Sequence, residues 1–313
     1  MKYLIRKILT FITTLFVVSL LCFGAFSVVP GDPASLILGT EASPERIAVL
    51  REQLGLNKPL FSQYKDWVLN LFSGNCGQSI KYNMPVQNII RDRLPVTLIL
   101  SLMVIIIIIL VSIPIGVYAA KKKDSLSGKF VNALTMINLS VPNFFLGIMF
   151  IWFFGMILKF FTPGGYISYA DNFLEFLKFM IFPAIAIAIP HIATVVKFLK
   201  SSILNEMKKE YVRTAYSKGN TKNSVLYSHV LKNSLISVVT LLGMIIAEIF
   251  SGSIIMEQVY GIPGIGRLII SSIPARDFPV VETLVIYIAF VVVIINAIVD
   301  LVLQFINPQV SIK

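Results

Sequence analysis

The sequence predicts an all-α integral membrane protein with about six transmembrane helices. Of its 313 residues, 56% are hydrophobic and only 14% are charged, and the mean hydropathy is +0.83. A soluble domain carries about 25% charged residues and has shorter apolar runs. Residues 97–120 contain no charged side chain. At about 1.5 Å per residue, such a run crosses the roughly 30 Å hydrocarbon layer of a bilayer.

Hydropathy places the transmembrane helices in six segments. They are residues 8–29, 97–119, 131–158, 178–196, 236–256 and 280–305. Pro142, Pro183 and Pro190 fall inside or beside these segments. A lipid-buried helix tolerates such a kink where neighbouring helices satisfy the freed carbonyl groups. We therefore expect kinked spans at these prolines.

The first segment has one feature of a signal peptide, because Lys2, Arg6 and Lys7 precede it. Its apolar stretch of about 20 residues is longer than the usual 7–15-residue signal core. Removing it would also leave an odd number of spans. We expect residues 1–29 to stay as an N-terminal anchor helix.

The charges are distributed asymmetrically about the six segments. With the N-terminus inside, the inner segments carry 16 Lys and Arg against 3 Asp and Glu, while the outer segments carry 11 of each sign. This distribution follows the positive-inside rule and places both termini in the cytoplasm. It also accounts for the pI of about 9.6 without a nucleic-acid partner.

An extracytoplasmic segment, residues 30–95, separates the anchor from a five-helix core over residues 96–313. Ser43 followed by Pro44 predicts a helix start, and Gly55 predicts its end. A second helix is predicted from Leu60 to Phe72. This segment either caps the outer mouth of the bundle or docks a soluble partner, and the two roles are compatible.

The longest inner loop, residues 197–235, has helix punctuation of its own. A short helix is predicted to stop at Gly219, and a second one to begin near Asn223 or Ser224. The small side chain of Ala215 would let a partner surface approach the first helix closely. A solvated loop that only obeys the positive-inside rule is the alternative.

This loop resembles the signature of binding-protein-dependent ABC permeases, in which Glu-Ala-Ala is followed by three residues and Gly. Aligned on Gly219, the three positions are Arg213, Thr214 and Ala215, so the acidic residue is replaced. The dipeptide/oligopeptide/nickel branch has the version found here. Its matching positions are Tyr211 to Ala215, Lys218, Gly219, His229, Leu231 and Asn233.

The likeness to this branch extends along almost the whole chain. Further matching pieces are Pro30-Gly31-Asp32-Pro33, Arg93-Leu94-Pro95, Ser140-Val141-Pro142, Glu257, Pro263-Gly264-Ile265-Gly266 and Arg276-Asp277-Phe278-Pro279-Val280. The tail reads Asn307-Pro308-Gln309 where the branch has Asp-Pro-Arg. Each piece alone is weak, but their order and spacing together are specific.

The resemblance implies a type I ABC importer permease fold in a bacterial cell membrane. The implied partners are a second homologous permease, two cytoplasmic ATPase subunits and an extracytoplasmic solute-binding protein. The implied cargo is a small hydrophilic solute, first a di- or oligopeptide, with nickel or a metal chelate as the alternative. Arg213, Thr214, Ala215 and Gly219 would couple the permease to the ATPase.

The chemistry of an enzyme is missing from the sequence. There is no G-x-x-x-x-G-K-[ST] loop, so we expect ATP to be hydrolysed by separate subunits and no cofactor to bind here. No catalytic or metal-ligating pattern occurs around His191 or His229. The rival function is a self-sufficient channel or proton-coupled carrier, which would need its own filter or relay.

Only Glu248 and Asp300 are candidates for such a relay, because they are the acidic residues within predicted spans once Glu282 is counted with the outer segment. An ionised side chain facing lipid costs about 2–3 kcal/mol on insertion scales. Both should therefore face the bundle interior or water. They either line a polar translocation path or form hydrogen bonds between helices, for example Asp300 near Asn296.

Overall fold

The computed structural model describes residues 2–28, 32–38, 42–53 and 55–306. Over these residues the chain is helical, and its only β-type pairing is an isolated bridge between Gln78 and Pro85. The sequence pieces Pro30-Gly31 and Asn307-Pro308-Gln309 lie outside the described residues. The expected all-α membrane fold is confirmed.

The chain divides into two compact units. Unit 1 comprises residues 1–95 and 267–293, and unit 2 comprises residues 96–266 and 294–313. Two boundaries between the units fall inside long helices. The boundary after residue 95 lies in α5 (Val86–Lys121), and the boundary after residue 293 lies in α13 (Phe278–Ile306).

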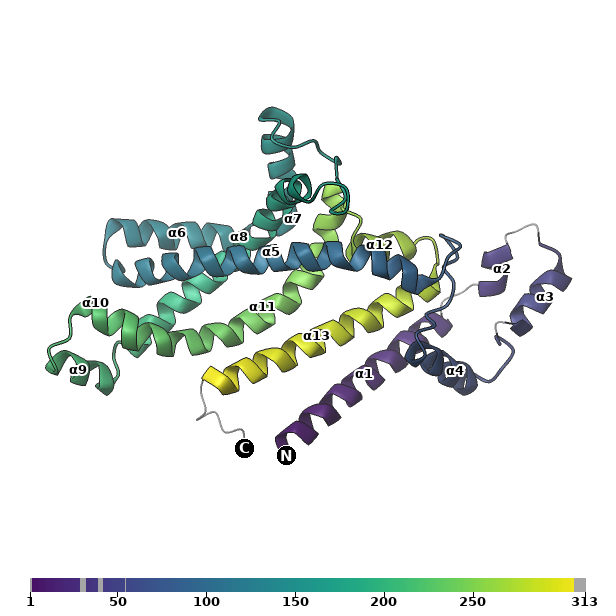
Figure 1. Ribbon diagram of the computed structural model, residues 1–313, viewed down its shortest axis with the longest axis horizontal. Helices are drawn as coiled ribbons and strands as arrows, with labels where there is room; N and C mark the ends of the chain where they lie inside the picture. The colour runs from purple at the N-terminus through teal and green to yellow at the C-terminus, as the bar shows by residue number, and fades with distance from the viewer. Residues whose placement is uncertain (1, 29–31, 39–41, 54, 307–313) are drawn as a thin grey trace. The chain divides into compact units, whose positions relative to one another are not determined.

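Unit 1 contains the N-terminal helix and the helices of the predicted extracytoplasmic segment. They are α1 (Lys2–Val28), α2 (Pro33–Leu38), α3 (Pro44–Gln53), α4 (Leu60–Phe72), most of α12 (Ile265–Ser272) and the first parts of α5 and α13. Within this unit, α1 and α13 run antiparallel (Figure 1), because Phe11 packs edge-on against Phe290 while Phe26 contacts Phe278. The outer helices α3 and α4 match the predicted start at Pro44 and the predicted range 60–72.

A buried carboxylate fixes one outer turn of unit 1. Asp277 is fully buried and accepts hydrogen bonds from Ser79 Oγ at 2.5 Å, from Ile80 N at 3.0 Å and from Lys81 N at 3.2 Å. Buried polar groups are normally hydrogen-bonded, and three donors satisfy this one. Residues 79–81 are therefore held against the segment that precedes α13.

Unit 2 is built around one long helix. Its elements after α5 are α6 (Leu126–Ser140), α7 (Asn143–Phe150), the π-helix η1 (Ile151–Ile157), α8 (Phe173–Glu206), α9 (Glu210–Ser217), α10 (Lys222–Val225), the π-helix η2 (Leu226–Val230) and α11 (Leu231–Tyr260). Helix α8 contacts α6, α7 and α11 (Figure 1), and its buried side chains include Phe176, Met180, Ile187 and Leu199.

The third predicted span, residues 131–158, is broken at Pro142, where only a kink was expected. The chain instead forms α6 and, after a break of two residues, the α7–η1 pair, and the two parts are bent by 98°. Val141 is extended, with φ −95° and ψ 121°, and Pro142 precedes α7. Proline lacks an N–H group and pushes the residue before it out of the helical region. A break results where a kink was expected.

The other spans are confirmed as helices, but most are longer than their apolar stretches. Helix α5 begins at Val86, ahead of residue 97, and α8 extends over Phe173–Glu206, beyond 178–196 at both ends. Backbone hydrogen bonding continues past the apolar residues, where hydropathy no longer detects the helix. Five described helices are long and apolar enough to cross a membrane, or six if the bent pair forms one crossing.

Candidate functional site

The inner loop folds into a short amphipathic helix that ends where the sequence predicts. Helix α9 runs from Glu210 to Ser217, and Gly219 follows it with φ +84°, a conformation that glycine adopts without steric cost. The N–H of Gly219 donates to Tyr216 O at 2.9 Å. The next helix, α10, begins at Lys222 after Thr221, whose side chain caps it.

The four predicted coupling residues lie close together in the sequence, within residues 213–219, but their side chains do not face the same side of the loop. Arg213 and Thr214 are exposed, as is Gly219. Ala215 is only 7% exposed and packs into the core of the chain together with Val212. The expectation that Ala215 offers a partner a close approach is therefore wrong. Its small size instead lets α9 pack closely against its own protein.

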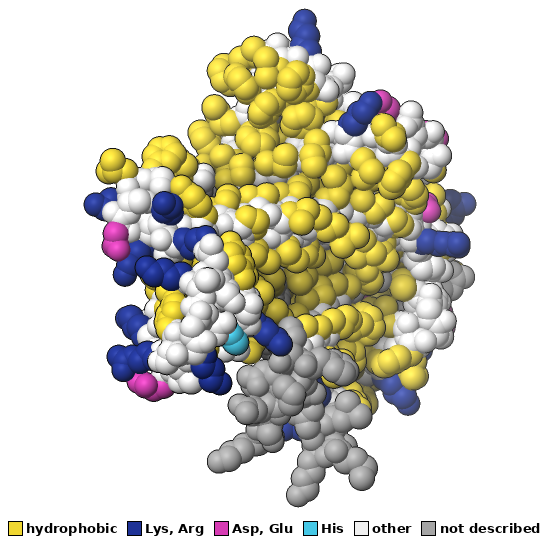
Figure 2. All heavy atoms as spheres, turned by 60° about the vertical axis from the view of Figure 1, so that its left-hand side comes forward, with side chains coloured by type: hydrophobic (Ala, Val, Ile, Leu, Met, Phe, Trp, Pro, Cys, Tyr) yellow, Lys and Arg dark blue, Asp and Glu magenta, His cyan; other side chains and the backbone are white. Residues whose placement is uncertain are grey.

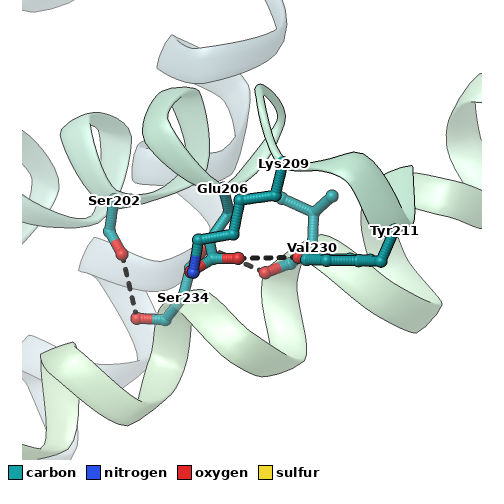
Figure 3. Close-up of polar contacts among 6 residues, drawn as sticks. All are labelled: Ser202, Glu206, Lys209, Tyr211, Val230 and Ser234. Carbon is teal, nitrogen blue, oxygen red and sulfur yellow. Dashed lines mark hydrogen bonds and ion pairs between the residues drawn. The ribbon is translucent and has the colours of Figure 1, made fainter. Parts of the chain in front are cut away.

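The carboxylate of Glu206 joins the end of α8 to the start of α9 (Figure 3). Lys209 Nζ lies 2.5 Å from Glu206 Oε1, and the hydroxyl of Tyr211 donates to Glu206 Oε2 at 2.7 Å. Burial, and then the Glu206 carboxylate, raise the pKa of the Tyr211 hydroxyl, while a hydrogen bond with Asn233 opposes them. The phenol therefore stays protonated and remains a donor to Glu206.

The same end of α8 is also tied to α11. Ser202 Oγ donates to the backbone carbonyl of Ser234 at 3.3 Å, and the buried Ser234 Oγ donates to Val230 O at 2.9 Å (Figure 3). Hydrogen bonds from two neighbouring turns of α8 thus fix both α9 and α11. The three helices form one hydrogen-bonded junction.

Basic side chains surround this junction. Lys and Arg gather around α9 and α10, beside a broad apolar surface (Figure 2). The exposed ones between residues 208 and 222 are Lys208, Lys209, Arg213, Lys218 and Lys222. An exposed cationic patch of this kind favours an acidic or anionic partner surface.

The two acidic residues of the predicted translocation path lie on different helices. Glu248 is on α11 with 66% of its side chain exposed, and its Oε2 atom lies 3.8 Å from Nδ1 of His191 on α8. Asp300 is half-buried on α13. Among the described residues, no three His, Cys, Asp or Glu side chains are grouped as a metal site.

A second acidic residue of α11, Glu257, has a role that sequence reasoning missed. Glu257 is fully buried, and Thr97 Oγ1 donates to its Oε1 atom at 2.6 Å, while Thr97 Oγ1 accepts from Ile265 N at 2.9 Å. A Cβ atom on Gly264 would overlap the Glu257 carboxyl group. The nearby Pro-Gly-Ile-Gly run was the available signal, because glycines commonly mark close approaches. Glu206 had no comparable signal.

Comparison with protein families identifies relatives along nearly the whole chain. The family described as "Binding-protein-dependent transport system inner membrane component" matches residues 112–312. The family described as "Binding-prot-dependent transport system membrane comp, N-term" matches residues 1–103.

Individual relatives match over the full length. A Brucella abortus protein named as a peptide transport system permease is 37% identical over 307 residues, which cover 98% of each chain. The oligopeptide transport system permease protein AppB of Bacillus subtilis is 33% identical, with 99% of each chain covered. The dipeptide transport system permease protein DppB of Alkalihalophilus pseudofirmus is 32% identical, also with 99% of each covered.

Among solved structures, a chain of the inward-facing MetNI methionine ABC transporter has a similar fold. The TM-score is 0.57 at 17% sequence identity, and the match covers 70% of this chain and 96% of that chain. At this identity the likeness concerns the fold.

Proposed function

Since this chain belongs to the inner membrane components of binding-protein-dependent transport systems, we propose that it conducts di- and oligopeptides through an ATP-driven ABC importer. It is a permease subunit and not an enzyme. Peptides come before nickel or a metal chelate as the cargo, because the relatives described above are named for peptide, oligopeptide and dipeptide transport.

An ABC importer permease works with an ATPase and a substrate-binding protein. We propose that this chain pairs with a second homologous permease, two cytoplasmic ATPase subunits and one extracytoplasmic binding protein. The surplus of Lys and Arg in the segments assigned to the inside supports cytoplasmic termini and a cytoplasmic α9. The membrane would then be the bacterial cell membrane, and ATP would bind only to the partner subunits.

The coupling element would be the exposed face of α9. Arg213 and Thr214 present this face, Gly219 closes the turn that follows, and Ala215 seats the helix on the body of the chain. The Glu206 junction is the observation that carries the proposal. It fastens α9 to α8, which is hydrogen-bonded to α11, so movement of α9 by an ATPase is passed to two long helices.

The test places a bulky side chain on the exposed face of α9. With the full set of transporter subunits in membrane vesicles, Thr214→Trp should remove co-purifying ATPase activity and ATP-dependent uptake of labelled tri-alanine. Its matched control is Thr10→Trp, the same change at an exposed helical position of the anchor helix α1. The control should keep both activities, and both variants should reach the membrane in normal amounts.

Two outcomes would contradict the proposal. If Thr214→Trp keeps its ATPase and its uptake, then α9 is not the docking element. If the wild-type transporter takes up tri-alanine without ATP, then the chain is a channel or a carrier. The cargo has its own test: ATP-dependent uptake of labelled Ni²⁺ without uptake of tri-alanine would replace peptides by the metal.

A further inference from the structure

Helix α11 presents its exposed side chains along one narrow stripe. Beyond Lys232 near its start, its exposed positions with described side chains are Asn233, Ser237, Thr240, Met244, Glu248, Ile255 and Gln258. At 3.6 residues per turn these positions lie within an arc of about 80°. Five of the seven are polar or charged. The stripe extends along almost the whole length of a helix that is long and apolar enough to span the membrane.

Helix α5 shows what a lipid-facing surface of this protein looks like. Its central exposed positions are spaced by four residues and are all apolar: Leu98, Leu102, Ile106 and Leu110. Polar groups facing hydrocarbon are costly, and an ionised carboxylate is costlier still. The α11 stripe is therefore unsuited to lipid, although it is as exposed as the α5 surface. Water, or a polar surface, must cover it.

The carboxylate of Glu248 lies midway along this stripe. It is 66% exposed, and the imidazole of His191 is beside it on α8, with 14% of that side chain exposed. One turn further along, Gly252 faces α7, and the amide of Asn143 fills the space where a side chain would begin. With 66% of its side chain exposed, the Glu248 carboxylate is accessible from outside the chain.

We propose that the α11 stripe lines the hydrated translocation path, and that Glu248 with His191 forms a transient binding point for positively charged groups of the cargo, such as an ammonium group. The inference rests on the proposed function, because it assigns part of this chain to the path of a transported solute. The carboxylate attracts the cation, and its exposure lets the cation leave, as conduction requires.

The experiment measures water access and local charge with thiol reagents in the assembled transporter. The two native cysteines are first replaced (Cys22→Ala, Cys76→Ser), and Met244→Cys is introduced one turn from Glu248. The probes are a trimethylammonium methanethiosulfonate and a sulfonate methanethiosulfonate of similar size. The matched control is Ile106→Cys on α5, since Ile106 is 46% exposed and Met244 is 56% exposed.

We expect Met244→Cys to react with both probes, and faster with the cationic one by about tenfold, which is the effect of one negative charge about 6 Å away in water. Adding Glu248→Gln should bring the ratio of the two rates close to one. Ile106→Cys should react with neither probe. The same vesicles are assayed for ATP-dependent uptake of tri-alanine.

A thiol at position 244 that reacts with neither probe would overturn the proposal, because the stripe would then be covered by lipid or by the second permease. An unchanged ratio after Glu248→Gln would overturn the role of this carboxylate. If uptake persists in either case, only this inference fails. If neither the wild-type transporter nor the cysteine-free parent takes up tri-alanine with ATP, the proposed function itself is refuted.

Discussion

Two glutamates on the same helix show how environment separates structure from function. Glu257 of α11 is fully buried, hydrogen-bonded to Thr97 and pressed against Gly264. Glu248, nine residues earlier, has 66% of its side chain exposed and a single described ionic neighbour, His191. The first carboxylate has a fixed position inside the fold, whereas the second remains accessible to something outside the chain.

The two carboxylates therefore differ in how much they affect the stability of the fold. A buried carboxylate that loses its partners is strongly destabilising, because the charge remains without compensation. An exposed one contributes little to stability, so its presence in a membrane-spanning helix calls for a different explanation. Stability measurements should therefore respond to changes around Glu257, while access and transport measurements should respond to changes around Glu248.

The largest effect is expected from Gly264→Ala. The new methyl group would overlap the Glu257 carboxyl group and displace it from Thr97. We expect the free energy of unfolding to fall by about 4 kcal/mol, measured by SDS titration of the purified protein. Gly24→Ala is the control, since no atom lies within 4 Å of the position that its new methyl group would occupy. Equal stability of the two variants would show that Glu257 moves freely.

A smaller effect on membrane integration is expected from placing one aspartate on each exposed surface. Ile106→Asp on α5 should lower insertion by about 3 kcal/mol, the cost of a charge near the centre of a span. Met244→Asp on α11 should cost much less, because its surface is already polar and carries Glu248. The measurement is the fraction of chain that resists alkaline carbonate extraction. Equal losses would place the α11 stripe against lipid.

The smallest effect is expected from Thr97→Val, which keeps the side-chain shape but removes the hydroxyl. That hydroxyl donates to Glu257 and accepts from Ile265 N. Leaving these buried groups without this partner should cost about 1–3 kcal/mol. Thr97→Ser keeps the hydroxyl and should retain most of the stability in the same SDS titration. A Ser variant as unstable as the Val variant would attribute the loss to packing.

Local signals in the sequence were enough to predict the bounds of helices whose ends are set by nearby residues. The range of α4 and the end of α9 before Gly219 follow from turn-forming glycines and helix starts. Proline was harder to interpret. Pro183 and Pro190 lie inside the continuous helix α8, whereas Pro142 lies in the break between α6 and α7. Contacts of α8 with three other helices distinguish these cases, and they arise only in the folded chain.

The candidate site could be proposed from the sequence, but the side of α9 that packs inward could not. Recognition of the loop depended on the pattern of residues 211–219, which says nothing about which side of α9 packs inward. Ala215 faces the core, on the same side of α9 as Val212 one turn earlier. The partners of Glu206 lie at positions 209 and 211, and those of Glu257 include distant Thr97. Only the fold brings Thr97 and Glu257 together.

The short connection between α8 and α9 has a mechanical consequence. Residues 207–209 alone separate the two helices, and Glu206 bridges this gap through Lys209 and Tyr211. A linker so short and so restrained has few conformations in which to absorb a push. Under the proposed coupling, a displacement of α9 would therefore reach α8 with little of it absorbed by the connection.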